Sequence, residues 1–243
     1  MTGRLLVRGM LVGLIAGLLA FGFAKVFGEP QVDKAIAFEE SMAHMHGDAE
    51  EEEELVSRDV QGSVGLLTGV VVYSVSLGGI FSLVFAYALG RIGRVGPRGL
   101  AALLALAAFV VVFLIPGLKY PPNPPSVGNP DTIGLRTQLF FLIMLVSIIA
   151  AVISVNAGRK LITRNGTWTG AISGVALYLV IVSVAAYLFP TINEVPENFS
   201  AVLLWKFRTA SLGIQVVLWT SLGLIFGKVA EQVLFPSRKA SSV

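Results

Sequence analysis

The chain contains no cysteine, and only two of its 243 residues are histidine. The absence of cysteine excludes disulfide bonds, thiolate metal sites and cysteine nucleophiles. Charged residues are also scarce, at 14% of the chain against roughly 25% in a soluble domain. The mean hydropathy is correspondingly high, at +0.79. A chain this apolar cannot be solvated on all sides, so its composition excludes an ordinary soluble domain.

Several motifs of catalysis and nucleotide binding are missing as well. The chain has no G-x-x-x-x-G-K-[ST] phosphate-binding loop and no H-E-x-x-H metalloprotease motif. No aspartate, glutamate or histidine falls near the middle of an apolar run, where proton-coupled transporters place such groups. The net charge of +3 comes from basic residues beside apolar runs and does not indicate nucleic-acid binding. We therefore predict that the protein is not an enzyme and binds no catalytic cofactor.

Long apolar runs dominate what is present. About 20 apolar residues are needed for a helix to cross a hydrocarbon core of ~30 Å. The runs are apolar on every face, which favours helices over the alternating strands of a membrane barrel. We predict an all-α, polytopic membrane bundle with one transmembrane domain over residues 1–243. Its six predicted crossings are residues 5–27, 62–90, 99–118, 134–157, 168–188 and 209–229.

The first run has two interpretations. Gly22-Phe23-Ala24 is a small-x-small sequence, which is typical of a signal-peptide cleavage site. The run is longer than the apolar region of a normal signal peptide, and Gly9, Gly13 and Gly17 form a small-residue stripe suited to helix packing. We therefore favour a retained helix. The same glycine spacing, which predicts further packing contacts, recurs at Gly65/Gly69, Gly170/Gly174 and Gly223/Gly227.

Basic residues predict the orientation of the bundle. Loops rich in lysine and arginine stay in the cytoplasm, and with six crossings all of the basic loops and ends fall on one side. We therefore predict that both termini are cytoplasmic and that the acidic and proline-rich loops are extracytoplasmic. The basic residues in question are Arg4, Arg8, Arg91, Arg94, Arg98, Arg159, Lys160, Arg164, Lys228, Arg238 and Lys239.

The predicted extracytoplasmic segment 28–61 contains both histidines and most of the acidic residues. Imidazole and carboxylate groups bind borderline divalent ions, and on a helix Glu40 and His44 would share one face. The sequence thus predicts that this segment captures a divalent cation, while the alternative is a solvated acidic loop. The candidate metal ligands are His44, His46, Glu40 and Asp48.

A proline-rich loop, predicted to be extracytoplasmic over residues 119–133, follows the third run. Five of the thirteen residues from Lys119 to Asp131 are proline, which fixes φ and favours a stiff, extended backbone. Taken alone it is a stiff linker between two helices. Because it lies on the same predicted side as the histidines, we favour a structural wall at the mouth of a pathway over a direct ion ligand.

Ten polar residues map to the same outer rim. Ionisable groups at helix ends can reach the membrane surface, so mutual pairing is a structural expectation and guidance of cations is the functional alternative. These outer-rim candidates are Asp59, Lys119, Tyr120, Asn123, Asp131, Arg136, Asn193, Glu194, Glu197 and Arg208.

Several stretches carry a family resemblance that covers nearly the whole chain. They are Leu5 to Met10, Ala20 to Pro30, Ala35 to Glu39, His44-Met45-His46 with the acidic run, Leu55-Val56-Ser57-Arg58-Asp59-Val60-Gln61, the proline-rich loop with Gly134 and Arg136-Thr137, Asn193-Glu194-Val195-Pro196, and Trp205-Lys206-Phe207-Arg208. The chain resembles the CbtA family of predicted cobalt transporter subunits. That resemblance implies a bacterial inner-membrane protein that supplies cobalt for cobalamin synthesis. It also implies a small single-helix partner, CbtB, with its own histidine motif, and five membrane helices rather than the six counted here.

The resulting hypothesis is a membrane subunit of a divalent-metal uptake transporter. Cobalt(II), or a similar divalent cation, would be its transported ligand, and capture would take place on the extracytoplasmic face. Its expected partners are the cation, the lipid bilayer and a CbtB-type subunit, and a homo-oligomer is also compatible with the sequence. The alternative is a non-transporting membrane scaffold or a metal-binding accessory protein.

Overall fold

The computed structural model describes residues 2–46, 56–93 and 95–235. All regular structure in these residues is helical, which confirms the all-α prediction. Six helices are long and apolar enough to cross a membrane, in agreement with the count from the apolar runs. Large apolar side chains such as Leu18, Ile80 and Leu106 are exposed along them, as expected of surfaces that face lipid. The six segments are Thr2–Met42, Arg58–Ala88, Pro97–Lys119, Pro130–Asn165, Thr167–Leu188 and Ala201–Leu234.

The chain divides into two compact units. The first comprises Met1–Ala108, Pro124–Ser126 and Ser200–Val243, and the second comprises Phe109–Asn123 and Val127–Phe199. The helices of the first unit are α1 (Thr2–Phe23), η1 (Ala24–Gly28), α2 (Glu29–His46), α3 (Arg58–Val60), η2 (Gln61–Gly65), α4 (Leu66–Ala88), α5 (Pro97–Ala108) and α9 (Ala201–Leu234). Those of the second unit are η3 (Phe109–Leu114), α6 (Ile115–Lys119), α7 (Pro130–Asn165) and α8 (Thr167–Leu188).

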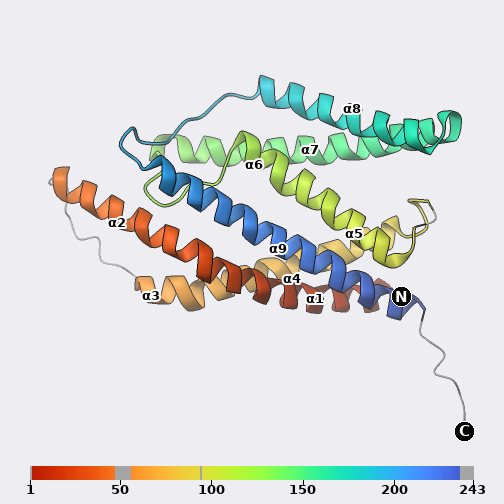
Figure 1. Cartoon of the computed structure of the whole chain (residues 1–243), viewed down its shortest axis with the longest axis horizontal. Coiled ribbons are helices and arrows are strands. Elements are labelled where there is room, and N and C mark those ends of the chain that lie inside the picture. Colours follow the sequence, from red (N-terminus) through yellow and green to blue (C-terminus); the bar gives the residue numbers. More distant parts are fainter. Residues whose placement is uncertain (1, 47–55, 94, 236–243) are drawn as a thin grey trace, which may run out of the picture. The chain divides into compact units, whose positions relative to one another are not determined.

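The first helix is longer than the sequence predicts. Segments α1, η1 and α2 form one continuous helix from Thr2 to His46 (Figure 1), whereas the apolar run ends at Phe27. Pro30 lies inside this continuous helix, directly after the π-helical turn η1, which accommodates it. Alanine, glutamate and methionine, all good helix formers, are frequent in the residues that follow. The change from apolar to polar residues after Phe27 therefore marks the end of the apolar segment but not the end of the helix.

Three turns of π-helix interrupt the spanning helices, and two of them precede a proline. Pro30 follows η1, and Pro116 follows η3. A proline inside a helix removes one backbone hydrogen bond and pushes away the carbonyl four residues earlier, which locally widens the helix. In η2 there is no proline, but the Ser63 Oγ donates a hydrogen bond to the Asp59 carbonyl, a side-chain bond that bends helices.

A stripe of small residues joins α1 and α4 in the first unit. A Cβ atom placed on Gly9 would lie 2.5 Å from the Gly78 carbonyl oxygen, and one on Gly17 would lie 2.8 Å from the Ser74 Cβ. The pairing order shows that the two helices run antiparallel at close backbone approach. This confirms the packing role predicted for Gly9, Gly13 and Gly17.

Two of the other three predicted glycine pairs also pack against a helix. In the second unit, a Cβ on Gly170 would lie 2.5 Å from the Ile162 amide, where α7 meets α8. In the first unit, a Cβ on Gly223 would lie 2.5 Å from the Ala105 Cβ, where α5 meets α9. The prediction was wrong for Gly65 and Gly69. Among the described residues, an added Cβ on Gly69 meets no atom within 4 Å, and one on Gly65 meets only Val60 of its own helix.

Each unit has its own core. In the first unit the Phe226 ring of α9 stacks edge-on against Phe81 and Phe85 of α4, with ring centroids 5.4 and 5.1 Å apart. In the second unit the Ser147 Oγ lies 2.8 Å from the Tyr178 hydroxyl and donates a 2.8 Å hydrogen bond to the Val111 carbonyl of η3. Ser147 thus binds a carbonyl in the π-helical turn, and it joins α7, α8 and η3 inside the bundle.

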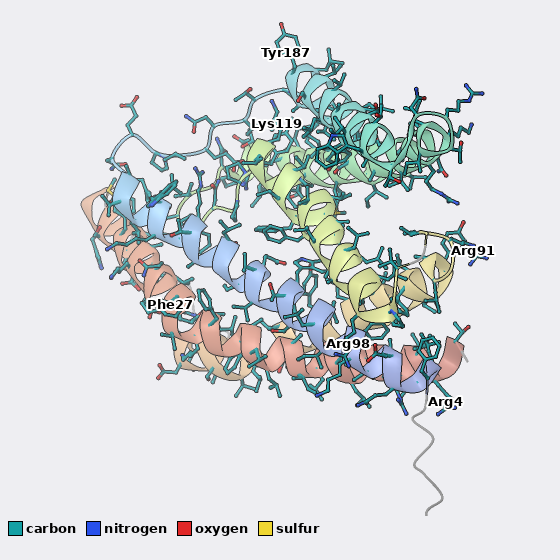
Figure 2. All side chains as sticks on the ribbon, turned by 45° about the vertical axis from the view of Figure 1, so that its right-hand side comes forward. Arg4, Phe27, Arg91, Arg98, Lys119 and Tyr187 are labelled. Carbon is teal, nitrogen blue, oxygen red and sulfur yellow. The ribbon has the colours of Figure 1, made fainter. Side chains whose placement is uncertain are left out.

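Several basic residues of the first unit lie at one end. Since Gly9 lies against Gly78 and Ser82, the N-terminus of α1 lies beside the C-terminus of α4. The Arg98 Nη2 at the start of α5 lies 2.5 Å from the Glu231 Oε2 near the end of α9. Figure 2 shows Arg4, Arg91 and Arg98 at this end and Phe27 away from it. This grouping agrees with the predicted single basic side for the first unit.

Candidate functional site

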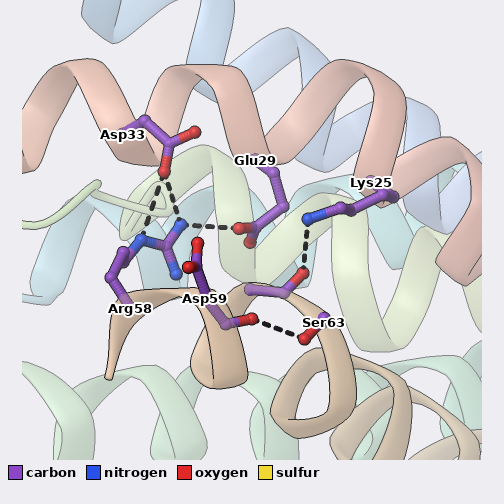
Figure 3. A network of polar contacts seen from close by, with 7 residues as sticks. Lys25, Glu29, Asp33, Arg58, Asp59 and Ser63 are labelled. Carbon is purple, nitrogen blue, oxygen red and sulfur yellow. Dashed lines mark hydrogen bonds and ion pairs between the residues drawn. The ribbon is translucent and has the colours of Figure 1, made fainter. Parts of the chain in front are cut away.

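A polar cluster in the first unit joins α2 to α3 (Figure 3). The Arg58 Nη2 of α3 lies 2.5 Å from the Glu29 Oε2 and 2.9 Å from the Asp33 Oδ1, and the Arg58 Nε lies 3.2 Å from the same Asp33 oxygen. Glu29 and Asp33 stand four residues apart on α2, so they present one face to the guanidinium. One arginine thereby joins α2 to the beginning of the second spanning helix.

Glu29 makes this cluster more than a surface contact. The residue is only 9% exposed, and a carboxylate at that depth requires a positive partner. Gly62 provides the space, because a Cβ at this position would collide with the Glu29 carboxylate. The Gly62 carbonyl, in the turn η2, accepts a 2.8 Å hydrogen bond from the Lys25 Nζ of η1. The π-helical turns η1 and η2 therefore meet beside the ionic contacts of Arg58 with Glu29 and Asp33.

None of these four charged residues is among the site residues predicted above. The signal was present, since Lys25, Glu29 and Asp33 are spaced four residues apart. That spacing is informative only on a helix, and the apolar pattern predicts that the first helix ends at Phe27. The structural continuation into α2 is what brings the three side chains onto one side.

A second cluster lies in the second unit and contains two predicted rim residues. The Arg136 Nη1 of α7 lies 3.4 Å from the Glu194 Oε2, and the Arg136 Nη2 donates to the Pro121 carbonyl. The Thr132 Oγ1 donates a 2.7 Å hydrogen bond to the Glu194 Oε1. The Glu194 side chain is 1% exposed and that of Arg136 is 19% exposed. This pairing joins the proline-rich loop, α7 and the loop that follows α8.

Tyr120 and Lys119 add a further link to the same loop. The buried Tyr120 donates a 2.8 Å hydrogen bond from its hydroxyl to the Pro190 carbonyl. The Lys119 Nζ lies 3.5 Å from the Thr191 Oγ1 and 5.9 Å from the centre of the Tyr120 ring. Burial raises the pKa of Tyr120 above its ordinary value, because the ionised phenolate is poorly solvated there. Tyr120 therefore acts as a neutral hydrogen-bond donor.

The middle of the proline-rich loop is also held by specific contacts. Pro124 to Ser126 belong to the first unit, where the Ser126 Oγ donates a 3.1 Å hydrogen bond to the Ala35 carbonyl of α2. Ser126 has a φ of 64°, an unusual value for a residue with a side chain. Val127, in the second unit, is buried. These contacts tie the loop to other protein atoms, and its role as a wall at the mouth of a pathway stays a prediction.

The predicted metal ligands lie at or beyond the end of α2. Glu40 and His44 are exposed and stand four residues apart on this helix. His46 is its last residue, and both the His46 side chain and Asp48 lie outside the described residues. Within the described residues, no group of three or more His, Asp or Glu side chains could hold a metal ion. The four-residue metal site therefore stays a prediction.

The other rim candidates divide between the units. Asp59 and Arg208 belong to the first unit, and Asn123, Asp131, Asn193 and Glu197 to the second. Asp59, Asp131, Asn193 and Glu197 are exposed, whereas Asn123 and Arg208 are partly buried. The Asn193 Oδ1 accepts a 3.3 Å hydrogen bond from the Val195 amide, which is a local loop contact. Within the second unit, the structure brings Arg136 and Glu194 into direct contact.

Comparison with known proteins identifies one family. The profile described as "Probable cobalt transporter subunit (CbtA)" matches residues 2–231, and thus nearly the whole chain. No curated protein and no solved structure matches the chain. Five of the six candidate membrane helices lie wholly within the match, and the sixth begins within it. The chain therefore belongs to the CbtA family of probable cobalt transporter subunits.

Proposed function

We propose that this protein is the membrane subunit of a divalent-cation uptake system, with Co²⁺ as its cargo. Membership of the CbtA family supports the transport role and the choice of metal. We propose further that the cation is first captured outside the membrane, on α2. The observation that carries this capture step is the exposure of Glu40 and His44 on a helix that is too long to lie within the bilayer.

The length of the first helix supports this placement. The helix runs without a break from Thr2 to His46, and at 1.5 Å per residue its 45 residues extend about 67 Å. The hydrocarbon core is about 30 Å thick, so only part of this helix can lie within it. The apolar residues 5–27 fill the core, and α2 then extends as an arm from the membrane surface.

Residue chemistry on the arm suits a borderline divalent ion. One carboxylate and one imidazole, spaced four residues apart on a helix, can reach the same ion. The proposed site adds His46 and Asp48, which follow directly in the sequence. Its composition, nitrogen and oxygen without sulfur, is compatible with Co²⁺ or a similar ion.

Orientation completes the proposal. We propose that the end that carries Arg4, Arg91 and Arg98 is cytoplasmic, because basic residues favour that side. In this orientation α2 would lie on the extracytoplasmic face of a bacterial inner membrane. The membrane potential then favours cation uptake by about 2.3 kcal/mol per charge per 100 mV. A single-helix CbtB-type subunit is the expected partner, and the chain could also associate with a second copy of itself.

The test is cobalt accumulation at limiting external cobalt, in cells that express either the wild type or the double variant His44→Ala/His46→Ala. We expect uptake by the double variant to fall severalfold and to recover at high cobalt, because capture raises only the local concentration of the ion. The matched control is Lys34→Ala, which removes an exposed side chain of α2 that cannot bind metal. Unchanged uptake by the double variant at limiting cobalt would exclude capture by these histidines.

A flux assay in liposomes separates transport from an accessory role. Purified protein, with and without the small partner, would be reconstituted and metal-dependent flux measured. Transport predicts cobalt flux in at least one of the two preparations. Bound metal without flux in both preparations would instead identify a metal-binding scaffold.

A further inference from the structure

The two halves of the first helix are held in different ways. The α1 half packs closely on α4 through Gly9, Gly13 and Gly17, with backbone atoms in contact. Such an interface leaves no space for relative movement of the two helices. The α2 half is held to the second spanning helix by the ionic contacts of Arg58 with Glu29 and Asp33, and to the proline-rich loop by the hydrogen bond from Ser126 to Ala35. It also makes a small contact with α9.

The joint between the two halves is the π-helical turn η1. Single π-helical turns inside α-helices are rare and frequently occur at functional sites. Here Pro30 follows the turn and removes the backbone hydrogen bond that would stiffen it. The second π-helical turn, η2, lies opposite, and the Lys25 Nζ of η1 binds its Gly62 carbonyl. The helix is therefore most easily bent at the level of the Arg58 cluster.

Arg58 occupies oxygen atoms that a free cation would also bind. Its guanidinium makes three hydrogen bonds to two carboxylates, one of which, Glu29, is buried. Carboxylate oxygens are common ligands of divalent ions. Because Glu29 is buried, it requires a positive partner at all times. Another cation can therefore release Arg58 only by taking its place between Glu29 and Asp33.

We propose that α2 is a hinged arm, with η1 as its hinge and Arg58 as a positioning residue that holds it closed. A divalent cation competes with Arg58 for Glu29 and Asp33, and its binding releases the arm. Closure by Arg58 stands on the observed contacts alone, whereas the nature of the competing ion rests on the proposed function. The arm would thus move the captured ion from the metal ligands of α2 toward the bundle.

Movement of α2 can be measured as the distance between two spin labels. The labels attach only to introduced cysteines, because the chain has no cysteine of its own. One label is placed on α2 (Ser41→Cys) and one on α4 (Ser76→Cys), both at exposed positions of the first unit. We expect a narrow distance distribution in the closed arm. In Arg58→Gln the distribution broadens or shifts, whereas Arg58→Lys, which retains the charge, stays close to the wild type.

A control pair reports on folding. Labels at Leu18→Cys on α1 and Tyr87→Cys on α4 both lie on the glycine-packed part of the unit and keep one distance in all variants. Glu29→Gln provides a second test of closure, since it removes the buried charge while Arg58 stays in place. An unchanged Ser41–Ser76 distance in both Arg58→Gln and Glu29→Gln would overturn the proposal.

Competition between a cation and Arg58 for the two carboxylates is tested separately, with diamagnetic Zn²⁺ as the probe ion. In a background of His44→Ala/His46→Ala, Zn²⁺ affinity is measured against a chromophoric chelator. We expect Arg58→Gln to bind Zn²⁺ at least about tenfold more tightly, because the competing guanidinium is gone. Adding Glu29→Gln and Asp33→Asn to that variant removes the gain. An unchanged Zn²⁺ affinity in Arg58→Gln would overturn the competition.

Failure of this proposal is distinguishable from failure of the proposed function. Both measurements use purified protein and require no transport. Loss of cobalt uptake in the histidine variant, together with a rigid arm, would leave the proposed function intact and exclude the hinge. An arm that opens with Zn²⁺, in a protein without flux, would confirm the hinge and exclude transport.

Discussion

The Arg136 Nη1 lies 3.4 Å from the Glu194 Oε2, and the Glu194 side chain is almost completely excluded from solvent. Removing one partner from a buried ion pair leaves an uncompensated charge and costs about 3–5 kcal/mol. We expect Arg136→Met to destabilise the protein toward the lower end of that range, because Arg136 itself is partly exposed. Thermal unfolding in detergent, followed by circular dichroism, measures the loss.

The control for this pair is the double variant Arg136→Met/Glu194→Gln. A neutral glutamine can still accept the hydrogen bond from the Thr132 hydroxyl, so the double variant should regain most of the lost stability. If the pair guides cations as well, Glu194→Gln will lower cobalt uptake in protein that remains folded. Normal uptake by this variant would assign the pair to structure alone.

Close packing of α1 on α4 leads to a second prediction. A leucine at Gly13 must displace the Ser74 backbone, since even a Cβ at this position would collide with the Ser74 carbonyl. We expect Gly13→Leu to lower stability by about 1–3 kcal/mol or more, as overpacking does. The control is Gly69→Leu on α4, where an added Cβ meets no described atom within 4 Å. Equal melting temperatures for the two variants would contradict the packing assignment.

Tyr120 gives a prediction about pH. Its pKa is raised by burial, so the folded protein favours the neutral phenol. The stability associated with this preference is fully present below the unfolded pKa of about 10 and is lost as the pH rises through the higher folded value. We expect Tyr120→Phe to remove that part of the alkaline loss of stability. It should also cost about 1 kcal/mol at neutral pH through the lost bond to Pro190.

Comparison with Tyr187→Phe isolates the effect of burial, because Tyr187 is 88% exposed. Unfolding of both variants would be followed between pH 8 and about 11, and only Tyr120→Phe should flatten the alkaline decline. Identical profiles for the two variants would show that the burial of Tyr120 does not affect stability in this range.

Ser147 and Tyr178 form a hydrogen bond between α7 and α8 within the second unit. Hydrogen bonds between membrane helices contribute on average about 0.6 kcal/mol, so we expect Ser147→Ala and Tyr178→Phe each to have a modest effect. Ser147 also binds the Val111 carbonyl, so its substitution should cost more than that of Tyr178. A double-mutant cycle on unfolding free energies measures the coupling, and strictly additive effects would contradict a direct bond.

Hydropathy, polarity and proline differ in how well they predict this structure from the sequence. Hydropathy and length were sufficient for six helices, because each run must exclude water over the thickness of the bilayer. Polarity failed to locate the end of the first helix, since a helix can leave the membrane without losing its hydrogen bonds. Pro30 and Pro116 were the available signals for two of the π-helical turns, and their position inside helical segments became clear only in the structure.

Glycine spacing shows why a pattern alone is ambiguous. The spacing is the same at Gly170/Gly174, which packs on α7, and at Gly65/Gly69, which packs on no described neighbouring helix. Which face of a helix meets a partner is decided by the whole bundle. In the same way, the rim prediction included Arg136 and Glu194, but several acidic and basic residues could have paired there. Only the tertiary fold selects this pair and buries its carboxylate.

The length of α2 has a consequence for electrostatics. At 1.5 Å per residue, about 22 Å of helix separates Glu29 from His44. Charges in water are screened over about 8 Å at physiological ionic strength. An ion captured near His44, as proposed above, would therefore be screened from Glu29 and Asp33. If capture and passage are coupled in this protein, the coupling has to be mechanical rather than electrostatic.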